Sequence, residues 1–258
     1  MVRPEEFGLN RSLLVLCALA GTSVTVAAQG GQTWPPNSME RPKPPVVDPG
    51  PERPPVPPPS DAIVLFDGKD LSQWQMRDSS PAEWTVRDGY VEVVPGTGTM
   101  RTRRTFGDVQ LHIEWATPNP PHGDSQERGN SGVFLMGLYE IQVLDGFQNL
   151  TYADGYQGAV YGQTPPLVNA SRPPGQWQTY DIVFHRPRFG PDGRVLRPAR
   201  VTVLHNGVLV QDHTEITGRT VHGAVAHYTP HADRLPLALQ DHEHPVRYRD
   251  IWVRELPE

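Results

Sequence analysis

The sequence of 258 residues is poor in cysteine: Cys17 is the one thiol in the chain. A lone cysteine excludes an internal disulfide framework and any cysteine-based zinc site, so a bound metal would need oxygen or histidine ligands. The sequence also lacks an excess of basic residues, since 23 Lys and Arg stand against 29 Asp and Glu, for a formal net charge of -6. This balance gives no electrostatic footprint for nucleic acid or an anionic membrane, and it favours neutral or weakly charged ligands.

Several catalytic signatures are missing as well. No glycine-rich phosphate loop follows a strand and opens a helix, and no Gly-x-Ser-x-Gly elbow occurs. Nucleotide chemistry and serine hydrolysis therefore have no support.

No segment after residue 60 carries the apolar stripe of an amphipathic helix. We therefore expect an all-β fold.

The N-terminus has the order of a secretory signal peptide. Arg11 precedes an apolar run, and small residues follow it up to Ala28. This order predicts a signal peptide over residues 1–28, cleaved after Ala28. A membrane anchor is the weaker alternative, because small and polar residues interrupt an apolar stretch that is already short for a span. We expect a secreted or periplasmic protein whose mature chain has no membrane span.

Residues 29–60 have a strongly biased composition. Of the 29 prolines in the chain, 12 fall between Pro35 and Pro59. Such a segment is typical of a polyproline-like, semi-rigid spacer. We predict a disordered proline-rich linker over residues 29–60, outside the fold, that associates the following domain with the cell envelope. The alternative is a ligand for a proline-reading partner.

Residues 61–258 are expected to form one domain in which apolar and polar residues alternate. In residues 109–115 every second residue is apolar, and the polar residues between them, Glu114 included, fall on the opposite face. Asn206-Gly207, between two such runs, is a strong signal for a type I′ hairpin. Many short strands with Gly-, Pro- and Asn-rich turns predict an all-β jelly-roll β-sandwich. Further strands are expected near residues 62–66, 90–94, 133–135, 139–144, 177–185, 200–205, 208–212 and 246–253.

The densest group of polar residues lies between Arg128 and Gln163. Strand alternation puts Glu140 and Gln142 on one face, and Asp145 would share the other face unless the strand ends before it. Beside the Arg-Gly-Asn-Ser-Gly turn that begins at Arg128, a carboxylate and an amide would suit sugar hydroxyls. The alternative of equal weight is a solvated strand face.

The C-terminal part offers a second group. Gln240 and His242 share a face, and His242 is the histidine best suited to carry a proton or to bind a metal. A cluster with Asp241 and His244 is a minority interpretation, because consecutive turn residues rarely converge on one ion. Calcium binding by the Asp-rich residues 145–154 lacks a regular loop spacing. We assign no metal ligand, leave a divalent cation open and expect no organic cofactor.

Five stretches of the sequence together carry a family pattern: residues 65–74, 128–135, 139–145, 205–207 and 239–242. With these stretches in order from about Ala62 to Leu256, the chain resembles the 3-keto-disaccharide hydrolase family. The resemblance implies a concanavalin A-like lectin/glucanase jelly roll in an exported bacterial protein. The sequence departs from the family in two places: Glu243 stands where the family usually has Gly, and Asp250 where it usually has Asn.

The resemblance also implies the substrate, a glycoside already oxidised to a ketone at C-3. The ketone acidifies the proton on C-2, so a base can remove it and the glycosidic oxygen can leave from C-1, with water adding later. We assign the base and the acid to Glu140 and His242, in an order left open, and expect Asp145 to orient a partner or hold a cation. The expected substrate-binding residues are Glu114, Arg128, Asn130, Gln142, Tyr161, Gln240 and Arg249.

Two other functions remain open at this point. A conventional glycosidase needs two carboxylates that flank the scissile bond, and Glu114, Glu140 and Asp145 would offer them. A carbohydrate-binding module would present the same concave face without catalysis, since the fold itself does not imply hydrolysis.

Overall fold

The computed structural model describes Met1 and residues 33–257. The predicted signal peptide therefore lies outside the described residues, apart from Met1. The chain divides into two compact units, Met1–Thr33 and Trp34–Glu258, and the second carries the strands. In the part of the chain that is described, no helix has the length and apolar character needed to cross a membrane.

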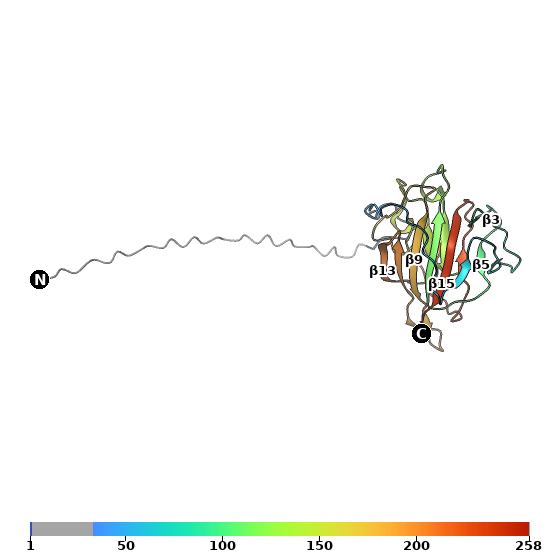
Figure 1. The fold of residues 1–258 in the computed structure, drawn as a ribbon. Helices are drawn as coiled ribbons and strands as arrows, with labels where there is room; N and C mark the ends of the chain where they lie inside the picture. Colours follow the sequence, from blue (N-terminus) through green and yellow to red (C-terminus); the bar gives the residue numbers. More distant parts are fainter. Residues whose placement is uncertain (2–32, 258) are drawn as a thin grey trace. The chain divides into compact units, whose positions relative to one another are not determined.

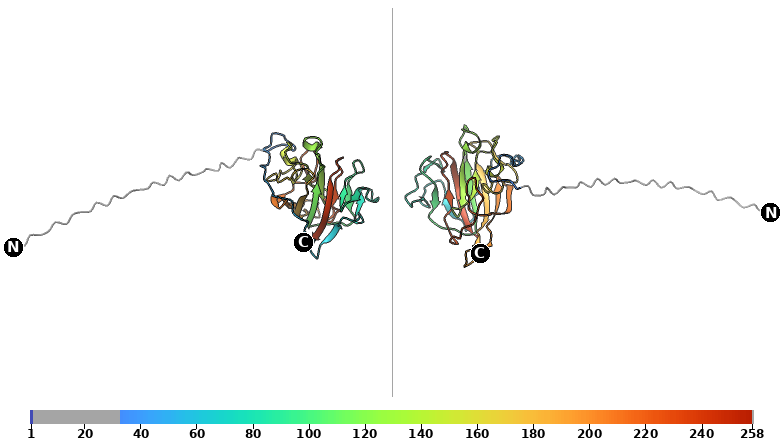
Figure 2. Two further views of the ribbon diagram at one scale, coloured as in Figure 1. Left: turned by 45° about the horizontal axis from the view of Figure 1, so that its top comes forward. Right: turned by 180° about the vertical axis from the view of Figure 1, so that it is seen from behind.

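Two antiparallel sheets make up the fold (Figure 1 and Figure 2). The larger sheet contains β1 (Ile63–Phe66), β3 (Thr85–Arg87), β4 (Tyr90–Glu92), β6 (Val109–Ala116), β9 (Gln178–His185), β12 (Arg200–His205), β13 (Val208–Glu215) and β15 (Arg247–Glu255). Its order is β13-β12-β9-β6-β15-β4-β3, and β1 pairs with β15. The smaller sheet contains β2 (Trp74–Met76), β5 (Met100–Thr102), β7 (Ser131–Leu135), β8 (Tyr139–Val143) and β14 (Ala238–Leu239), in the order β2-β5-β14-β7-β8.

Four short elements lie outside these sheets. β10 (Arg188–Phe189) and β11 (Val195–Arg197) form a separate hairpin, and two single-turn 3-10 helices occur at η1 (Ser125–Glu127) and η2 (Ala153–Gly155).

Strand alternation builds the core between the two sheets. From β6 the side chains of Leu111, Ile113 and Trp115 are buried in it, and from β8 those of Ile141 and Val143. Each strand thus gives one face to the core and leaves the other face for loops, solvent or a ligand. The predicted all-β jelly-roll sandwich is confirmed.

The predicted hairpin at Asn206-Gly207 is also confirmed. It joins β12 to β13, with His205 paired to Val208. Asn206 has φ 55° and Gly207 has φ 80°. Positive φ at both central positions is the requirement of a type I′ turn, which Asn-Gly meets at low cost.

The proline-rich segment differs from the expectation of a disordered spacer. The Asn169 N–H donates to the Pro45 carbonyl, and the Val47 N–H donates to the Asn169 carbonyl, each at 2.9 Å. The guanidinium of Arg172 donates to the carbonyls of Gly50 at 3.2 Å and Pro51 at 3.1 Å. Proline removes a donor but keeps its acceptor, so a proline-rich chain can still pair with buried donors. Residues 45–56, here called the strap, therefore lie against the domain.

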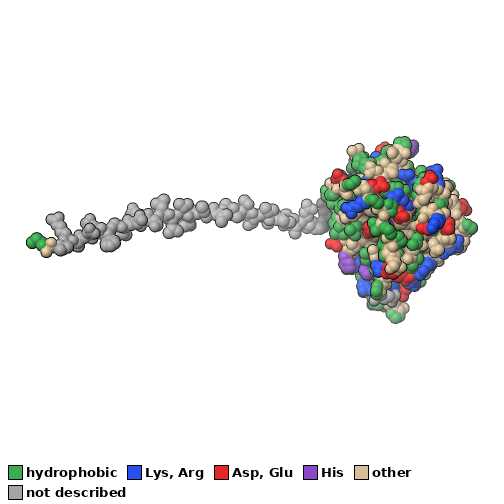
Figure 3. Space-filling view, viewed as in Figure 1, with side chains coloured by type: hydrophobic (Ala, Val, Ile, Leu, Met, Phe, Trp, Pro, Cys, Tyr) green, Lys and Arg blue, Asp and Glu red, His purple; other side chains and the backbone are tan. Residues whose placement is uncertain are grey.

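Acidic and basic side chains are interspersed over the face of the molecule in Figure 3. This distribution agrees with the small net charge of the sequence. A surface of mixed charge gives no broad attraction for a polyanion.

Candidate active site

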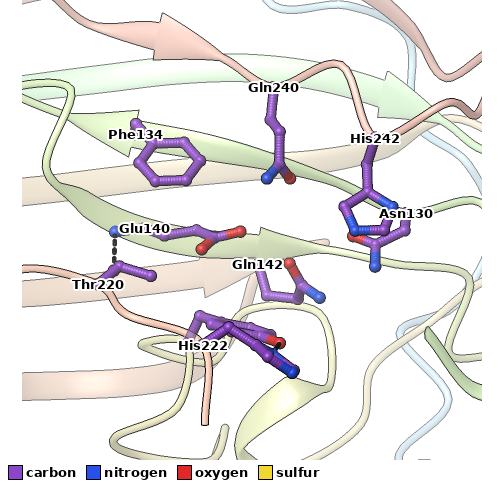
Figure 4. Close-up of a pocket in the computed structure, with 9 residues that line it drawn as sticks. Asn130, Phe134, Glu140, Gln142, Thr220, His222, Gln240 and His242 are labelled. Atoms are coloured by element: carbon purple, nitrogen blue, oxygen red, sulfur yellow. Dashed lines mark hydrogen bonds between the residues drawn. The ribbon is translucent and has the colours of Figure 1, made fainter. Parts of the chain in front are cut away.

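A cavity of about 260 Å³ opens on the outer face of the smaller sheet (Figure 4). Its lining joins β7, β8 and the chain after β14 to two segments that are distant in sequence. The lining residues are Asn130, Phe134, Glu140, Gln142, Tyr161, Thr220, His222, Gln240 and His242.

The pairing of β7 with β8 places three of these residues on one face, together with Gly132. Phe134 lies opposite Glu140, and Gly132 lies opposite Gln142. The Gln240 N–H donates to the Gly132 carbonyl at 3.0 Å, so the pairing with β7 continues past the end of β14. Glycine at 132 provides space, because a Cβ there would lie 2.5 Å from Glu140 Oε1.

The Glu140 side chain is nearly inaccessible, with 4% of its surface exposed. The Tyr161 N–H donates to the Glu140 carbonyl at 3.2 Å, and the Glu140 N–H donates to Thr220 Oγ1 at 3.0 Å, so two covering segments are fixed to this residue. Removal from water disfavours the charged carboxylate and raises the pKa of Glu140 to about 8. Glu140 therefore keeps its proton at neutral pH, and the interpretation of this strand face as solvated is wrong.

The Gln142 amide lies between Glu140 and Ser131. With its nitrogen toward them, it donates to Glu140 Oε1 at 3.1 Å and to the Ser131 carbonyl at 2.9 Å. The opposite orientation would set the amide oxygen against the Ser131 carbonyl oxygen, and two acceptors cannot form a hydrogen bond with each other. Gln142 thus supports the Glu140 carboxyl group from the next outward position of the same strand.

The rings of Tyr161 and His222 form one wall, and Tyr152 supports Tyr161 from behind the lining. The hydroxyls of Tyr152 and Tyr161 lie 2.5 Å apart, and the Tyr161 hydroxyl lies 2.8 Å from His222 Nδ1. Sequence reasoning missed His222, Thr220 and Phe134 as lining residues. His222 and Thr220 follow the end of β13 in irregular chain, where no alternation places a side chain on a face.

The chain after β14 supplies Gln240 and His242. Gln240 Oε1 is buried and has no hydrogen-bond partner among the described residues, so it can accept from a ligand. The His242 ring stacks on His244 with centroids 5.8 Å apart. Between them Glu243 adopts φ 62°, in the left-handed region that favours glycine. The turn therefore has the geometry that a Gly would take most easily.

Asp145 and Arg128 do not line this cavity. β8 ends at Val143, so strand alternation no longer governs Asp145. Its carboxylate pairs with Arg128 Nε at 2.7 Å, and Arg128 also donates to the Phe147 carbonyl at 3.1 Å. Burial raises the pKa of Asp145, although Arg128 opposes this shift. Both side chains line a neighbouring hollow with Glu243. The structure therefore corrects their prediction as residues of this site and places them beside the cavity.

Glu114 and Arg249 lie on the other sheet. They belong to β6 and β15, where the Arg249 Nε donates to Glu114 Oε2 at 2.6 Å. The Arg249 guanidinium lies over the Trp177 ring, 4.1 Å from its centroid, and 3.7 Å from Glu52 of the strap. Their prediction as residues of the same site is wrong, because alternation fixes which face of a strand a residue occupies but not which sheet the strand joins.

A third ionic residue completes this group under the strap. His112 Nδ1 lies 2.7 Å from Asp181, and His112 Nε2 lies 3.9 Å from Glu114. Burial opposes a charge on His112, but the hydrogen bond to Asp181 and the nearby Glu114 carboxylate outweigh it and raise the pKa of His112 to about 9. Burial likewise acts against charge on Glu114, yet His112 and Arg249 hold its pKa below the ordinary value. The group is a set of ion pairs in which the buried His112 Nε2 has no hydrogen-bond partner among the described residues.

The described residues contain no group of three or more His, Cys, Asp or Glu side chains arranged to hold a metal ion. Asp241, considered above with His242 and His244, accepts from the N–H groups of Gly98 and Glu243, both at 2.8 Å. Asp154, in the Asp-rich stretch, accepts from the Asn37 N–H at 3.2 Å.

Comparisons with known proteins place the chain in a family. The sequence model of the 3-keto-alpha-glucoside-1,2-lyase-like domain matches residues 61–254. The chain is similar to a provisionally assigned glycosyl hydrolase from Parabacteroides distasonis ATCC 8503, with 44% identity, a TM-score of 0.75, and coverage of 80% of this chain and 94% of that one. A second provisionally assigned glycosyl hydrolase from this organism shares 19% identity and the fold, with a TM-score of 0.55 and coverage of 76% and 94%. No curated protein matches the chain.

The family match spans well over half of the chain and includes the cavity residues on β7, β8 and the segment after β14. The resemblance inferred from the sequence is thereby confirmed, and similarity to glycosyl hydrolases supports a carbohydrate-active protein. The chain belongs to the family of 3-keto-alpha-glucoside-1,2-lyase-like domains.

Proposed function

We propose that this protein cleaves glycosides whose sugar carries a ketone at C-3, by elimination across C-1 and C-2 followed by hydration. One observation carries the proposal: the cavity brings together the buried carboxyl group of Glu140 and the imidazole of His242. Burial raises the pKa of Glu140 to about 8, which suits this group to hold a proton at neutral pH. A proton donor and a proton acceptor in one cavity are what an elimination needs.

The chemistry divides between these two groups. The His242 imidazole takes the proton from C-2, and the electron pair forms an enolate on the C-3 oxygen. The enolate then re-forms the C-3 carbonyl, the C-1 to C-2 double bond forms, and the bond from C-1 to the glycosidic oxygen breaks. Glu140 gives its proton to that oxygen, which leaves as an alcohol. Water later adds its hydroxyl to C-1 and a proton to C-2, which yields the 3-keto sugar.

Amide groups of the lining are suited to hold the sugar through this reaction. Asn130 and Gln240 face the same cavity, and Gln240 Oε1 is free to accept from a sugar hydroxyl. Donors near the C-3 oxygen would stabilise the charge that develops there. Each positioned proton-transfer group typically contributes about 10²–10⁴-fold to the rate.

The lining favours elimination over a conventional glycosidase mechanism. A glycosidase uses two carboxyl groups on either side of the bond. Glu140 is the one carboxyl group among the described residues that line the cavity. Asp145 is paired with Arg128 beside it, and Glu114 lies on the other sheet. The family description, which names a 1,2-lyase of 3-keto-alpha-glucosides, supports the same reaction.

We also propose that the protein is exported and acts outside the cytoplasm. The basic, apolar and small-residue order of residues 1–28 supports this proposal. An envelope-associated site of action would agree with the proline-rich residues that follow.

The test is product release by the purified protein from 3-keto glucosides and from their unoxidised parents. We expect the alcohol to appear only with the keto forms, together with the absorbance of an enone. Glu140→Gln and His242→Ala should each lower turnover by about 10²-fold or more, while the exposed Glu83→Gln serves as the matched control.

Two results would overturn the proposal. Equal release from oxidised and unoxidised sugars would show an ordinary glycosidase. Binding of the parent sugars without release from either form would show a carbohydrate-binding module.

A further inference from the structure

A second cleft, of about 390 Å³, adjoins the cavity and shares Phe134 and Gln240 with it. It carries three arginines, Arg77, Arg101 and Arg219, and its described lining contains no carboxylate. The other lining residues are Thr99, Met136, Gly137, Leu138, Leu235, Pro236 and Ala238.

Strand register connects the cleft to the catalytic carboxyl group. Arg101 of β5 pairs with Ala238 of β14, Ala238 pairs with Phe134 of β7, and Phe134 pairs with Glu140 of β8. Directly paired residues point to the same face of a sheet, so Arg101 and Glu140 face the same side. Three strand spacings separate their backbones by roughly 14 Å. The cavity and the cleft therefore follow one another along this face of the sheet, with Phe134 and Gln240 common to both.

The arginines form no salt bridge with a described carboxylate. No described carboxylate lies within salt-bridge distance of Arg77, Arg101 or Arg219. Arg101 donates to Ser79 Oγ at 3.2 Å, and its buried Nε has no hydrogen-bond partner among the described residues. The nearby Asp78 carboxylate accepts at Oδ1 from the N–H and hydroxyl of Ser80, at 2.9 and 2.6 Å. These hydrogen bonds, and to a smaller extent the charge of Arg101, lower the pKa of Asp78, but the two side chains form no salt bridge.

The cleft is therefore positively charged, whereas the molecule as a whole has a negative net charge. The chain has a net charge of -6, yet this concave region concentrates three guanidinium groups. Clefts lined by one sign of charge focus the field and raise the local concentration of the opposite ion. Guanidinium groups match carboxylate, sulfate and phosphate groups in geometry as well as in charge.

The cleft also has an apolar side. Met136, Leu138 and Leu235 line it, and Phe134 stands at the border with the cavity. A ring that lies against these side chains would place an anionic substituent near the arginines. We propose that this cleft receives the leaving group of the substrate, and that the leaving group is an apolar ring bearing an anionic group. This inference rests on the proposed function, since it takes the scissile bond to lie at Glu140.

A matched pair of substrates tests the inference. The 3-keto glucosides of 4-hydroxybenzoic acid and of its methyl ester differ in the charge at the far end of the ring. We expect kcat/KM to be about tenfold higher for the acid, because a charge-assisted hydrogen bond is among the stronger polar contacts. The preference should fall as salt is added, because ions screen partly exposed charges.

Two variants test whether the cleft causes the preference for the acid over the ester. Arg101→Gln and Arg219→Gln should each lower the ratio of acid to ester by about three- to tenfold. Arg219 is exposed and lies outside the strands, so its variant guards against loss of folding. The control is Arg197→Gln, an exposed arginine of β11 that does not line the cleft and should keep the wild-type ratio. An equal ratio in wild type and both cleft variants would overturn the inference.

A binding measurement separates this inference from the proposed function. The unoxidised glucosides of the acid and of the ester are titrated into wild type and into Arg101→Gln by calorimetry. Tighter binding of the acid by wild type, lost in the variant, supports the cleft even if no keto substrate is cleaved. Equal binding of acid and ester by wild type refutes the cleft even if both keto substrates are cleaved.

Discussion

Replacing Glu140 with Gln should stabilise the protein while it removes activity. Burial raises the pKa of Glu140 from its ordinary value of 4.5 to about 8. The native state therefore holds a proton that the unfolded chain has already released at neutral pH. Glutamine has the same shape, remains neutral and bears no such penalty, so the catalytic group is also a source of instability.

The size of the effect follows from proton linkage. Below pH 4.5 both states bind the proton, and Glu140 has no pH-dependent effect. Between about pH 4.5 and pH 8 the native state binds more protons than the unfolded state, so the free energy of unfolding falls by about 1.4 kcal/mol per pH unit. By pH 7 the loss reaches roughly 3 kcal/mol, and above the folded pKa it levels off.

Urea unfolding followed by tryptophan fluorescence measures this difference. Wild type, Glu140→Gln and the exposed control Glu83→Gln are compared at about pH 5, 7 and 8.5. The advantage of Glu140→Gln should be small at the lowest pH and grow with pH, while the control follows wild type. A difference that does not change with pH, or a variant less stable than wild type at the highest pH, would refute the burial argument.

Further predictions concern activity, a turn and the strap. The activity kcat/KM should fall above about pH 8 as Glu140 loses the proton that it donates, and a pH-rate profile that stays level to pH 10 would contradict this role. Gly132→Ala places a Cβ 2.5 Å from Glu140 Oε1 and should reduce turnover with little change in the far-ultraviolet circular dichroism; full activity would show that the carboxyl position is not limiting. Glu243→Gly relieves φ 62° and should raise the free energy of unfolding by up to about 1 kcal/mol, as measured in urea, whereas a loss of stability would contradict strain at this turn. Deleting residues 33–60 takes two carbonyl partners from Arg172 and should lower that free energy by roughly 2–4 kcal/mol; an unchanged urea midpoint would mean that the strap does not contribute.

Local pattern predicted much of the larger sheet. The alternation in residues 109–115 corresponds to β6, and Asn206-Gly207 forms the predicted hairpin between β12 and β13. Both signals depend on neighbouring residues alone. The strands β2, β5, β10 and β11 have two or three residues each. Such short runs have too few alternating positions to stand out, and they form because partner strands complete their hydrogen bonds.

The candidate site was predicted in part, for a related reason. Alternation placed Glu140 and Gln142 together because they share one strand, and the structure brings Asn130, Tyr161, Gln240 and His242 to the same cavity. Burial of Glu140 could not be deduced, since it depends on covering segments from elsewhere in the chain. The place of Glu114 under the strap depends likewise on the long-range pairing of β6 with β15.

The shortest strand of the smaller sheet has a mechanical consequence. β14 consists of two residues, Ala238 and Leu239, and within the described fold it joins the β2-β5 pair to the β7-β8 pair. Backbone hydrogen bonds continue past both ends of this strand, from the Gln240 N–H to the Gly132 carbonyl at 3.0 Å and from the Thr102 N–H to the Leu237 carbonyl at 2.9 Å. Glu140 lies on one side of the seam and Arg101 on the other. A substitution that broke the pairing at β14 would therefore change the gap between these two side chains without altering the hairpin that holds the carboxyl group.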